Sequence, residues 1–330
     1  MKINRNSLVN ALQKVKPGLS NDDWVEQTNT FVFEKDKIRT YNELISVVFP
    51  FTTDLVGAVK AKEFYDIIAK YPDEEIEITQ DEFKFIVKGK GRKSSVNTEQ
   101  QISLPVVSVD GSWKELPGNF KEALSFCLFN ASKDMSIPYQ NCLNVDEDRI
   151  ISYDSYRGTI YKLDKEIENQ FLIPAKVVKE LIKYNPTHYI ASNSFIHFKN
   201  TEGITFSSRK RMDKFKDLSE FFTVENIVSL TVPKEIEKIL DRVAVLAGKD
   251  EEGDKLITLV LDNNKLIFEG KGVIGKHTEE IDIEYTGEKL KIMTSPVFLK
   301  EIISHSNTIG IGNRLVFETD KFKHVCLRSL

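Results

Sequence analysis

The sequence has 330 residues and a formal net charge of −4, with 41% hydrophobic and 29% charged residues. These proportions are typical of a folded globular protein and exclude an intrinsically disordered chain. The length is enough for two or three domains of ordinary size, and no apolar run approaches the ~20 residues that a membrane-spanning helix needs. The N-terminal residues lack a signal-peptide core, and the cysteines Cys127, Cys142 and Cys326 form no C-x-x-C pair. We therefore expect reduced thiols in a cytoplasmic protein with no membrane partner.

Six amphipathic segments predict helices along the chain, at 5–18, 60–71, 119–133, 174–184, 232–249 and 296–305. The clearest pattern lies in the last third, where Ile236, Ile239, Leu240, Val243 and Leu246 fall on one stripe. Between the helices, alternating apolar and polar runs such as 30–38, 142–151 and 256–268 predict strands. The turn at 262–265 predicts a hairpin in the last of these runs.

Three of the helices belong to a segment that recurs through the chain. It reads VKAKEFYDIIAKYPDEEIEI at 59–78, IPAKVVKELIKYNPTHYIAS at 173–192 and TSPVFLKEIISHSNTIGIGN at 294–313. Each copy predicts a short helix, a turn and an apolar strand, and the spacing of roughly 115–120 residues is the size of a domain. A second helix opens each third, so the order helix, strands, helix, strands predicts an α+β fold with two helices on an antiparallel sheet. We expect three tandem domains, at 1–112, 113–222 and 223–330.

Two phosphate-binding patterns overlap at Gly270–Lys276, which fits G-x-G-x-x-G and most of G-x-x-x-x-G-K-[ST]. Both motifs need a helix directly after the loop, so that its N-terminus faces the phosphate. Here a period-two strand follows, and His277 stands where Ser or Thr is required, so we predict a glycine-rich hairpin instead. The five histidines show no metal-ligand spacing, and no residue stands out as a nucleophile or general base. The sequence thus predicts neither an enzyme nor a cofactor or metal site.

Charge is unevenly distributed along the chain. The six predicted helices carry a net charge of +8, which leaves −12 for the rest of the sequence. An acidic shell with basic helices suits a polyanion that is held against the helical face. The alternative is an ordinary lysine-rich helix face that is simply solvated.

On these features the chain resembles the bacterial β-type sliding clamp of DNA replication over essentially its whole length. SYDSYRG at 152–158 is similar to the family's T-D-G-H-R-L segment, and FLIPAK at 171–176 to its V-I-V-P-R-K segment. RVAVL at 242–246 is similar to R-A-A-I-L, and Leu104-Pro105 with Trp113 to F-P-x-L-x-x-W. Ser155, Tyr156 and the tail at 326–330 depart from the family, as expected for a divergent member, for example one encoded by a phage.

The resemblance implies that the three clamp-type domains of two copies join head to tail in a homodimeric ring around double-stranded DNA. Such a ring would tether a DNA polymerase for processive synthesis, and an ATP-dependent clamp loader would open it; neither a catalytic residue nor a cofactor is implied. The loop cations at 92–93 and 209–211 would either touch the duplex at a ring face or lie in solvent. The cations that would face the DNA in the pore are Lys14, Lys16, Lys62, Lys121, Lys133, Lys176, Lys179, Lys183, Lys238 and Arg242.

The resemblance also implies a groove between the second and third domains that takes a partner peptide with apolar anchors. The groove residues would be Tyr153, Ser155, Tyr156, Arg157, Gly158, His324, Cys326 and Leu327. At the interface between the copies, Val245 and Leu246 of one chain would meet Leu104, Val106 or Val107 of the other. A three-repeat scaffold that binds only protein, without encircling DNA, is the alternative function.

Overall fold

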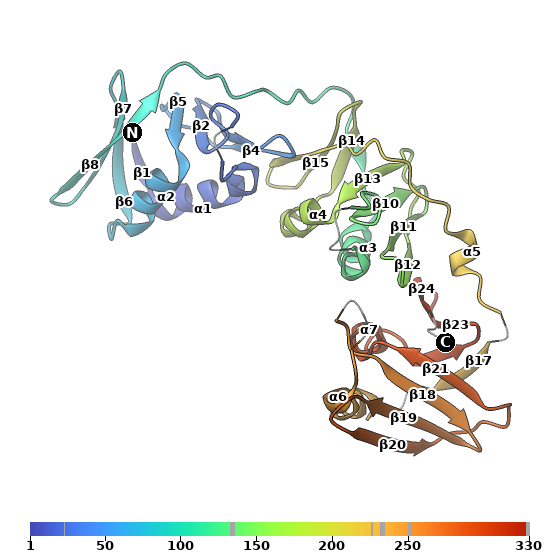
Figure 1. The fold of residues 1–330 in the computed structure, drawn as a ribbon. Coiled ribbons are helices and arrows are strands. Elements are labelled where there is room, and N and C mark those ends of the chain that lie inside the picture. The colour runs from blue at the N-terminus through green and yellow to red at the C-terminus, as the bar shows by residue number, and fades with distance from the viewer. Residues whose placement is uncertain (23, 133–135, 226, 232–234, 250–252, 328–330) are drawn as a thin grey trace. The chain divides into compact units, whose positions relative to one another are not determined.

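The computed structural model describes residues 1–22, 24–132, 136–225, 227–231, 235–249 and 253–327. The chain, coloured from blue at the N-terminus to red at the C-terminus in Figure 1, divides into two compact units, each made of two segments. Unit 1 comprises Met1–Lys121 and Lys176–Met212, and unit 2 comprises Glu122–Ala175 and Asp213–Leu330. None of the helices within the described ranges is both long and apolar enough to cross a membrane.

Unit 1 is built on one sheet of twelve antiparallel strands. Strand β4 pairs with β16, with Ser46 opposite Ser207, so the sheet joins the two segments of the unit. In spatial order the strands are β1 (Lys2–Asn4), β6 (Glu75–Gln80), β7 (Lys84–Gly89), β8 (Arg92–Glu99), β5 (Gly57–Lys60), β2 (Thr30–Glu34), β3 (Lys37–Tyr41), β4 (Ile45–Pro50), β16 (Thr205–Arg209), β15 (Phe195–Lys199), β14 (His188–Ala191) and β9 (Lys114–Glu115).

Two helices cover the first part of this sheet, α1 (Arg5–Val15) and α2 (Ala61–Lys70). Helix α1 begins at Asn4, whose side chain accepts a hydrogen bond from the Ser7 amide at 3.0 Å, and it continues into a 3₁₀ turn at Lys16–Gly18. Helix α2 buries Phe64, which packs edge to face with Phe33 of the sheet, with ring centroids 5.7 Å apart. The apolar stripes predicted at 5–18 and 60–71 therefore face the core of unit 1.

Unit 2 contains two further antiparallel sheets. In the larger sheet β12 pairs with β24, with Tyr161 opposite Phe322, which joins distant parts of the chain. Its order is β13 (Phe171–Pro174), β10 (Cys142–Asp146), β11 (Arg149–Tyr153), β12 (Arg157–Lys162), β24 (Phe322–Leu327), β23 (Arg314–Glu318), β22 (Thr308–Ile311) and β17 (Val228–Thr231). The smaller sheet has the order β20 (Lys276–Asp282), β19 (Lys265–Lys271), β18 (Ile257–Asp262) and β21 (Leu290–Thr294).

The helices α6 (Ile236–Leu246) and α7 (Pro296–Ile303) pack against each other, and α6 lies on β19 and β20. Helix α3 (Phe120–Cys127) continues into a 3₁₀ turn at Leu128–Asn130, and α4 (Ala175–Leu181) into one at Ile182–Tyr184. All six predicted helices are thus present. The structure adds α5 (Ser219–Phe222), which the sequence did not predict because a single turn has no readable periodicity.

The recurring segment takes the predicted form in all three places, as α2 followed by β6, α4 followed by β14, and α7 followed by β22. The α+β class with antiparallel sheets is therefore confirmed. The hairpin between β18 and β19 turns at Asn263 and Asn264, whose φ angles of 48° and 61° suit asparagine. The Gly270–Lys276 segment is also a hairpin, because β20 pairs with β19 directly after it, as predicted.

Candidate functional site

A basic surface forms in unit 1 where α1, α2 and the 3₁₀ turn after α4 come together. Lys14, Lys16 and Lys183 line one open cavity there, with a volume of about 560 Å³. The Gln13 amide donates a hydrogen bond to the Tyr65 hydroxyl at 2.7 Å, which ties α1 to α2. The Lys16 ammonium lies 5.5 Å from the centroid of the Tyr65 ring. Three predicted DNA-facing cations from distant parts of the sequence therefore share one surface.

The cations of this surface have exposed protein partners. Lys14 lies 3.1 Å from a carboxylate oxygen of Glu202, and Lys183 lies 2.8 Å from Glu180. The Tyr184 hydroxyl donates to the main-chain carbonyl of Lys14 and fixes the turn after α4 against α1. Ion pairs this exposed contribute little to stability, so a phosphate group can replace the carboxylates at small cost.

The remaining predicted pore cations that the structure describes lie on helices α2, α3, α4 and α6. Lys133 lies outside the described residues. Arg242 on α6 makes a bidentate ion pair with Glu279, with nitrogen–oxygen distances of 2.6 and 2.7 Å. This hydrogen bonding lowers the pKa of Glu279 to about 2. The Lys121 ammonium donates to the Asn185 side chain. Among the predicted pore cations, those exposed on α2, α4 and α6 are Lys62, Lys176, Lys179, Lys238 and Arg242; the acidic Glu63, Glu237 and Asp241 are exposed on the same helices.

The loop cations of unit 1 contact their own unit. Arg92 pairs with Asp73 at 2.8 Å. Arg209 donates to the Glu43 carbonyl at 2.5 Å, and its guanidinium lies 5.1 Å from the centroid of the Phe195 ring. These contacts orient both arginines, and Lys93 and residues 210–211 follow them in the chain.

In unit 2, Arg157 of the predicted partner groove is buried at the start of β12. It pairs with Asp154 at 2.9 Å and with Glu301, and it donates to the Phe129 carbonyl at 3.0 Å. Its guanidinium also lies 3.9 Å from the centroid of the Phe298 ring. Burial opposes the charge of this guanidinium, but the two carboxylates outweigh burial and raise the pKa of Arg157. Arg157 therefore ties β12 to α7 within the unit.

His324 and Cys326 of the predicted groove lie in the core of the same sheet. The Nδ1 atom of His324 is 2.8 Å from the Thr159 hydroxyl, and its Nε2 atom is 3.1 Å from the Cys326 sulfur. Burial lowers the pKa of His324 to about 3 and raises the pKa of the Cys326 thiol to about 12. Both groups are therefore neutral parts of the core near pH 7.

Helix α5 covers the sheet surface formed by two other predicted groove residues. Tyr153 and Gly158 are opposite each other on β11 and β12. The Phe221 ring packs edge to face on Tyr153, with centroids 4.9 Å apart. A Cβ atom at position 158 would lie 2.9 Å from Phe222 and 3.0 Å from Phe221, so the glycine allows both rings to approach. This aromatic pair occupies the apolar surface that the sequence suggested for a partner.

The exposed part of the predicted groove is the turn between β11 and β12. Tyr156 is 46% exposed, and its carbonyl accepts a hydrogen bond from the amide of Leu327 at 2.6 Å. Ser155 adopts a φ of 77° and its hydroxyl accepts from the Gln140 side chain at 2.6 Å. The structure therefore brings Tyr156 and Leu327 together at the surface, although far apart in sequence.

The predicted interface residues differ in exposure. Leu104 is buried in the core of unit 1, while Val106 is 74% exposed and Val107 packs partly against that core. On α6, Val245 is 69% exposed and Leu246 is half-buried. Val106 and Val245 are thus the residues of this set that have strongly exposed apolar side chains.

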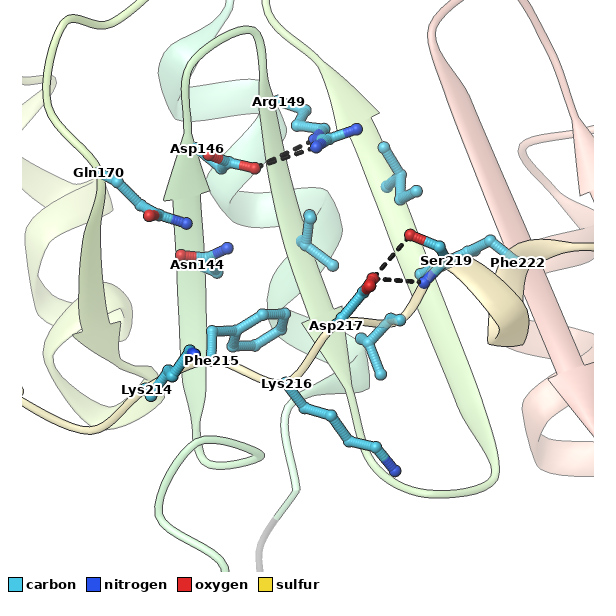
Figure 2. Close-up of a pocket in the computed structure, with 13 residues that line it drawn as sticks. Asn144, Asp146, Arg149, Gln170, Lys214, Phe215, Lys216, Asp217, Ser219 and Phe222 are labelled. Carbon is cyan, nitrogen blue, oxygen red and sulfur yellow. Dashed lines mark hydrogen bonds and ion pairs between the residues drawn. The ribbon is translucent and has the colours of Figure 1, made fainter.

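A polar cavity in unit 2 was not predicted. It has a volume of about 290 Å³ and lies between β10–β12 and the connecting segment 214–219 (Figure 2). Its floor includes Asn144, a buried side chain in the predicted strand at 142–151. The sequence holds no signal for this burial, because Asn144 shares its strand face with Cys142 and Asp146, and the apolar Ile151 opposite it belongs to the next strand. Within the described ranges, no group of three His, Cys, Asp or Glu side chains is placed to hold a metal ion.

No protein-family model matches the sequence. A curated "Beta sliding clamp" of Chlamydia pneumoniae is 25% identical over 168 residues, which are 46% of this chain and 43% of that protein, so the match spans less than half of the relative. The fold is similar to a sliding clamp from Bartonella birtlesii solved with griselimycin, with a TM-score of 0.88, 18% identity and coverage of 100% and 99% of the two chains.

Two further solved structures give the same result. The DNA polymerase III subunit beta of Pseudomonas aeruginosa has a TM-score of 0.87 at 18% identity, covering 100% of this chain and 99% of that one. The DNA polymerase sliding clamp of Bacillus subtilis has a TM-score of 0.85 at 18% identity, covering 100% and 98%. These alignments cover nearly the full length of both chains, so the chain has the fold of the bacterial β sliding clamps.

Proposed function

We propose that this chain is a DNA sliding clamp, in which two copies close head to tail around duplex DNA and tether a polymerase for processive synthesis. Each copy contributes three clamp domains, at 1–112, 113–222 and 223–330. The protein acts in the cytoplasm as a non-enzymatic ring that needs no cofactor. An ATP-dependent loader opens the ring, because a closed ring cannot pass onto circular DNA unaided.

The observation that carries this proposal is the joint presence of the clamp fold over the full chain and the basic surface of Lys14, Lys16 and Lys183. These lysines lie on an open surface rather than in a narrow groove that could read base edges. Contacts of this kind neutralise phosphates without regard to sequence, and their energy varies little as a duplex moves past. Loose electrostatic contact combined with topological enclosure is what sliding requires.

Two sheet edges support closure between copies. Strand β20 is the terminal strand of the four-stranded sheet, and β8 pairs with β5 only at Thr98 and Glu99. An unpaired strand edge presents main-chain donors and acceptors that a second chain can satisfy. In the proposed ring, β20 of one copy pairs with β8 of the next, and the exposed Val245 and Val106 lie beside this seam.

The polymerase contact is proposed at the exposed turn of Tyr156 and the neighbouring Leu327. These two side chains are apolar, exposed and adjacent, which suits the anchors of a short partner peptide. Calorimetric titration of a polymerase-tail peptide against Tyr156→Ala should show about tenfold weaker binding than the parent chain. Equal affinities would place the polymerase contact elsewhere on the ring.

The decisive experiment for encirclement uses a nicked circular plasmid and the cognate loader. Loaded protein should remain on the closed circle through gel filtration at high salt and leave when a restriction enzyme linearises it. A matched circle without the cut site controls for simple dissociation. Light scattering should give a mass twice the 37.8 kDa of one chain. Equal retention on cut and uncut DNA, or a monomer of undiminished activity, would contradict the proposal.

A further inference from the structure

Gln27 is a buried residue with an unusual backbone conformation, in the turn before β2. Its φ angle is 62°, in the left-handed region that residues with a side chain rarely adopt. The Gln27 carbonyl accepts hydrogen bonds from the amide and the hydroxyl of Thr30, at 3.1 and 2.7 Å, which fix this conformation. Residues held in such a conformation are concentrated at functional sites. In this conformation the Gln27 side chain reaches two segments of unit 1, the end of β8 and residues 101–104.

The Gln27 amide joins these two segments through four hydrogen bonds. Its Nε2 atom donates to a carboxylate oxygen of Glu99, at the end of β8, and to the carbonyl of Gln101, both at 2.8 Å. Its Oε1 atom accepts from the amides of Ser103 and Leu104 at 2.9 and 3.0 Å. These bonds use both donors and both lone pairs of the side-chain amide. The amide therefore takes the place of a neighbouring strand for a segment that belongs to no strand itself.

Arg39 on β3 holds the next part of the same segment. Its guanidinium donates to the carbonyls of Leu104 and Pro105, at 3.1 and 3.0 Å. The Leu104 side chain is buried in the core of unit 1, and Pro105 has no amide hydrogen. Each main-chain donor and acceptor of these two residues thus has the side chain of Gln27 or Arg39 as its partner. The strongly exposed Val106 therefore follows directly on a main chain that is fixed on both sides.

The two segments that the Gln27 amide joins lie at the proposed seam between copies, in which β8 pairs with β20 and Val106 lies beside the pair. Two surfaces bind more tightly when they are ordered before they meet, because less conformational freedom is lost on binding. We propose that Gln27, supported by Arg39, is a positioning residue for ring closure, which holds β8 and residues 101–105 in the arrangement that a second copy contacts. This inference rests on the proposed ring. It adds that a residue buried within one copy sets the strength of the seam.

The first test is Gln27→Glu in the full-length chain. The new carboxylate can still accept from the amides of Ser103 and Leu104, but it has no hydrogen to donate and repels Glu99. The dissociation constant of the dimer, measured by analytical ultracentrifugation, should rise about tenfold. The double variant Gln27→Glu with Glu99→Gln reverses the direction of one hydrogen bond and should recover part of the affinity. An unchanged dissociation constant in the single variant, or no recovery in the double variant, would overturn the proposal.

Asn42 supplies a matched control, because its side-chain amide makes the same kinds of bond in unit 1 with partners outside β8 and residues 101–106. Its Nδ2 atom donates to the carbonyls of Pro17 and Leu19, and its Oδ1 atom accepts from the amides of Leu44 and Ile45. Asn42→Asp should therefore lower the stability of unit 1 in urea in a similar way but leave the dissociation constant of the dimer unchanged. Equal weakening of the dimer by this control would show that any loss of stability loosens the ring, and would overturn the positioning role.

Gln27→Gly is a second, independent variant. Glycine adopts a φ of 62° without strain, so the chain should fold, but the side-chain amide is gone. Its dimer should dissociate more readily, and the amides of Ser103 and Leu104 should exchange faster with deuterium. A Gln27→Gly dimer as tight as the parent dimer would contradict the proposal.

The parent chain distinguishes a failure of this inference from a failure of the ring. A parent that is monomeric at every concentration would overturn the ring, and the positioning role with it. A parent that dimerises and encircles DNA, while Gln27→Glu and Gln27→Gly dimerise equally well, would overturn the positioning role alone.

Discussion

His324 is a single buried residue that makes the free energy of unfolding depend on pH. Burial first, and the nearby charge of Arg157 second, lower its pKa in the folded chain to about 3 from the usual 6.5. The unfolded chain takes up a proton as pH falls through about 6.5, whereas the folded chain does not until about pH 3. The free energy of unfolding should therefore fall as pH is lowered through this range, by at most about 1.4 kcal/mol per pH unit from this residue.

Urea unfolding between pH 7 and pH 4 measures this slope. His324→Gln should be less stable than the parent at pH 7, because its contacts with Thr159 and Cys326 are lost, but its stability should fall less steeply with acid. Parallel slopes for the parent and His324→Gln would mean that His324 does not titrate between the two states.

At the scale of residues, the sequence predicted the helical positions of the basic residues better than the contacts of their side chains. It placed Lys14, Lys16 and Lys183 on helix faces, because amphipathic periodicity assigns each helical residue a direction. It could not foresee that Arg157 is buried, since the compensating Glu301 comes from a segment far along the chain. The residues close to Arg157 in the sequence do not indicate such a distant partner. For the same reason, the buried Oδ1 atom of Asn144, which has no hydrogen-bond partner among the described residues, could be identified only once the strands were paired.

At the scale of elements, the short helix α5 packs on the larger sheet of unit 2. Its two phenylalanines cover Gly158, and Arg314 donates to the carbonyls of Glu220 and Thr223 at 2.5 and 3.2 Å, which holds the end of this single turn. Gly158→Ala should destabilise the protein by about 1–3 kcal/mol, because the new Cβ meets both rings. Urea unfolding checks this change.

The matched second substitution is Phe222→Leu, which removes the ring atom closest to position 158. The double variant Gly158→Ala with Phe222→Leu should recover part of the loss, so the two effects should not add. Strict additivity in the double-mutant cycle would show that the alanine and the ring do not compete for the same space.

Helix α6 provides the second prediction at this scale, through the outward residue Val245. Because its side chain is exposed within one copy, Val245→Lys should leave each chain folded. If the residue lies at the seam between copies, the substitution buries an unpaired charge there and should produce a folded monomer. Light scattering with circular dichroism distinguishes these states. Val297→Lys, at another exposed valine on α7, should remain dimeric.

The half-buried neighbour Leu246 gives a sharper comparison. Leu246→Lys should also dissociate the ring, but with some loss of stability because part of this side chain packs within the unit. A dimer that withstands both substitutions would rule out this end of α6 as the seam.

The elements themselves were predictable to different degrees. The six longer helices have apolar stripes that repeat along the helix, and three of them recur with the same following strand, so periodicity and repetition agree. Strand partners such as β4 with β16 and β12 with β24 join residues far apart, and no local pattern specifies them. The hairpin at Gly270–Lys276 was predictable because the strand after the glycines alternates with a period of two.

At the scale of the whole molecule, weak binding to open DNA should be governed by salt. Each phosphate contact contributes about 0.9 to the slope of log affinity against log salt concentration. The triple variant Lys14→Ala, Lys16→Ala and Lys183→Ala should therefore reduce that slope on linear duplex by about 2–3. Fluorescence anisotropy between 50 and 200 mM salt, a range over which such contacts are strongly screened, measures it.

Substitution of Lys291 by alanine should leave this slope unchanged, since β21 lies outside the basic surface. An unchanged slope in the triple variant would mean that the duplex contacts other cations. The change should be the same for duplexes of unrelated sequence, because phosphate contacts carry no base information.

The pairing of β12 with β24 also has a consequence for how the protein is made. Strand β12 is synthesised long before its neighbour β24, yet it pairs with that strand from Arg157 to Tyr161. While the nascent chain is still on the ribosome, one edge of β12 is therefore unpaired. The apolar residues next to it stay exposed until the rest of the sheet has been synthesised. Unit 1 has no such delay beyond Met212. Ribosome-bound chains halted before residue 322 should resist protease in unit 1 and be cleaved in unit 2, so maturation proceeds from one end of the chain to the other.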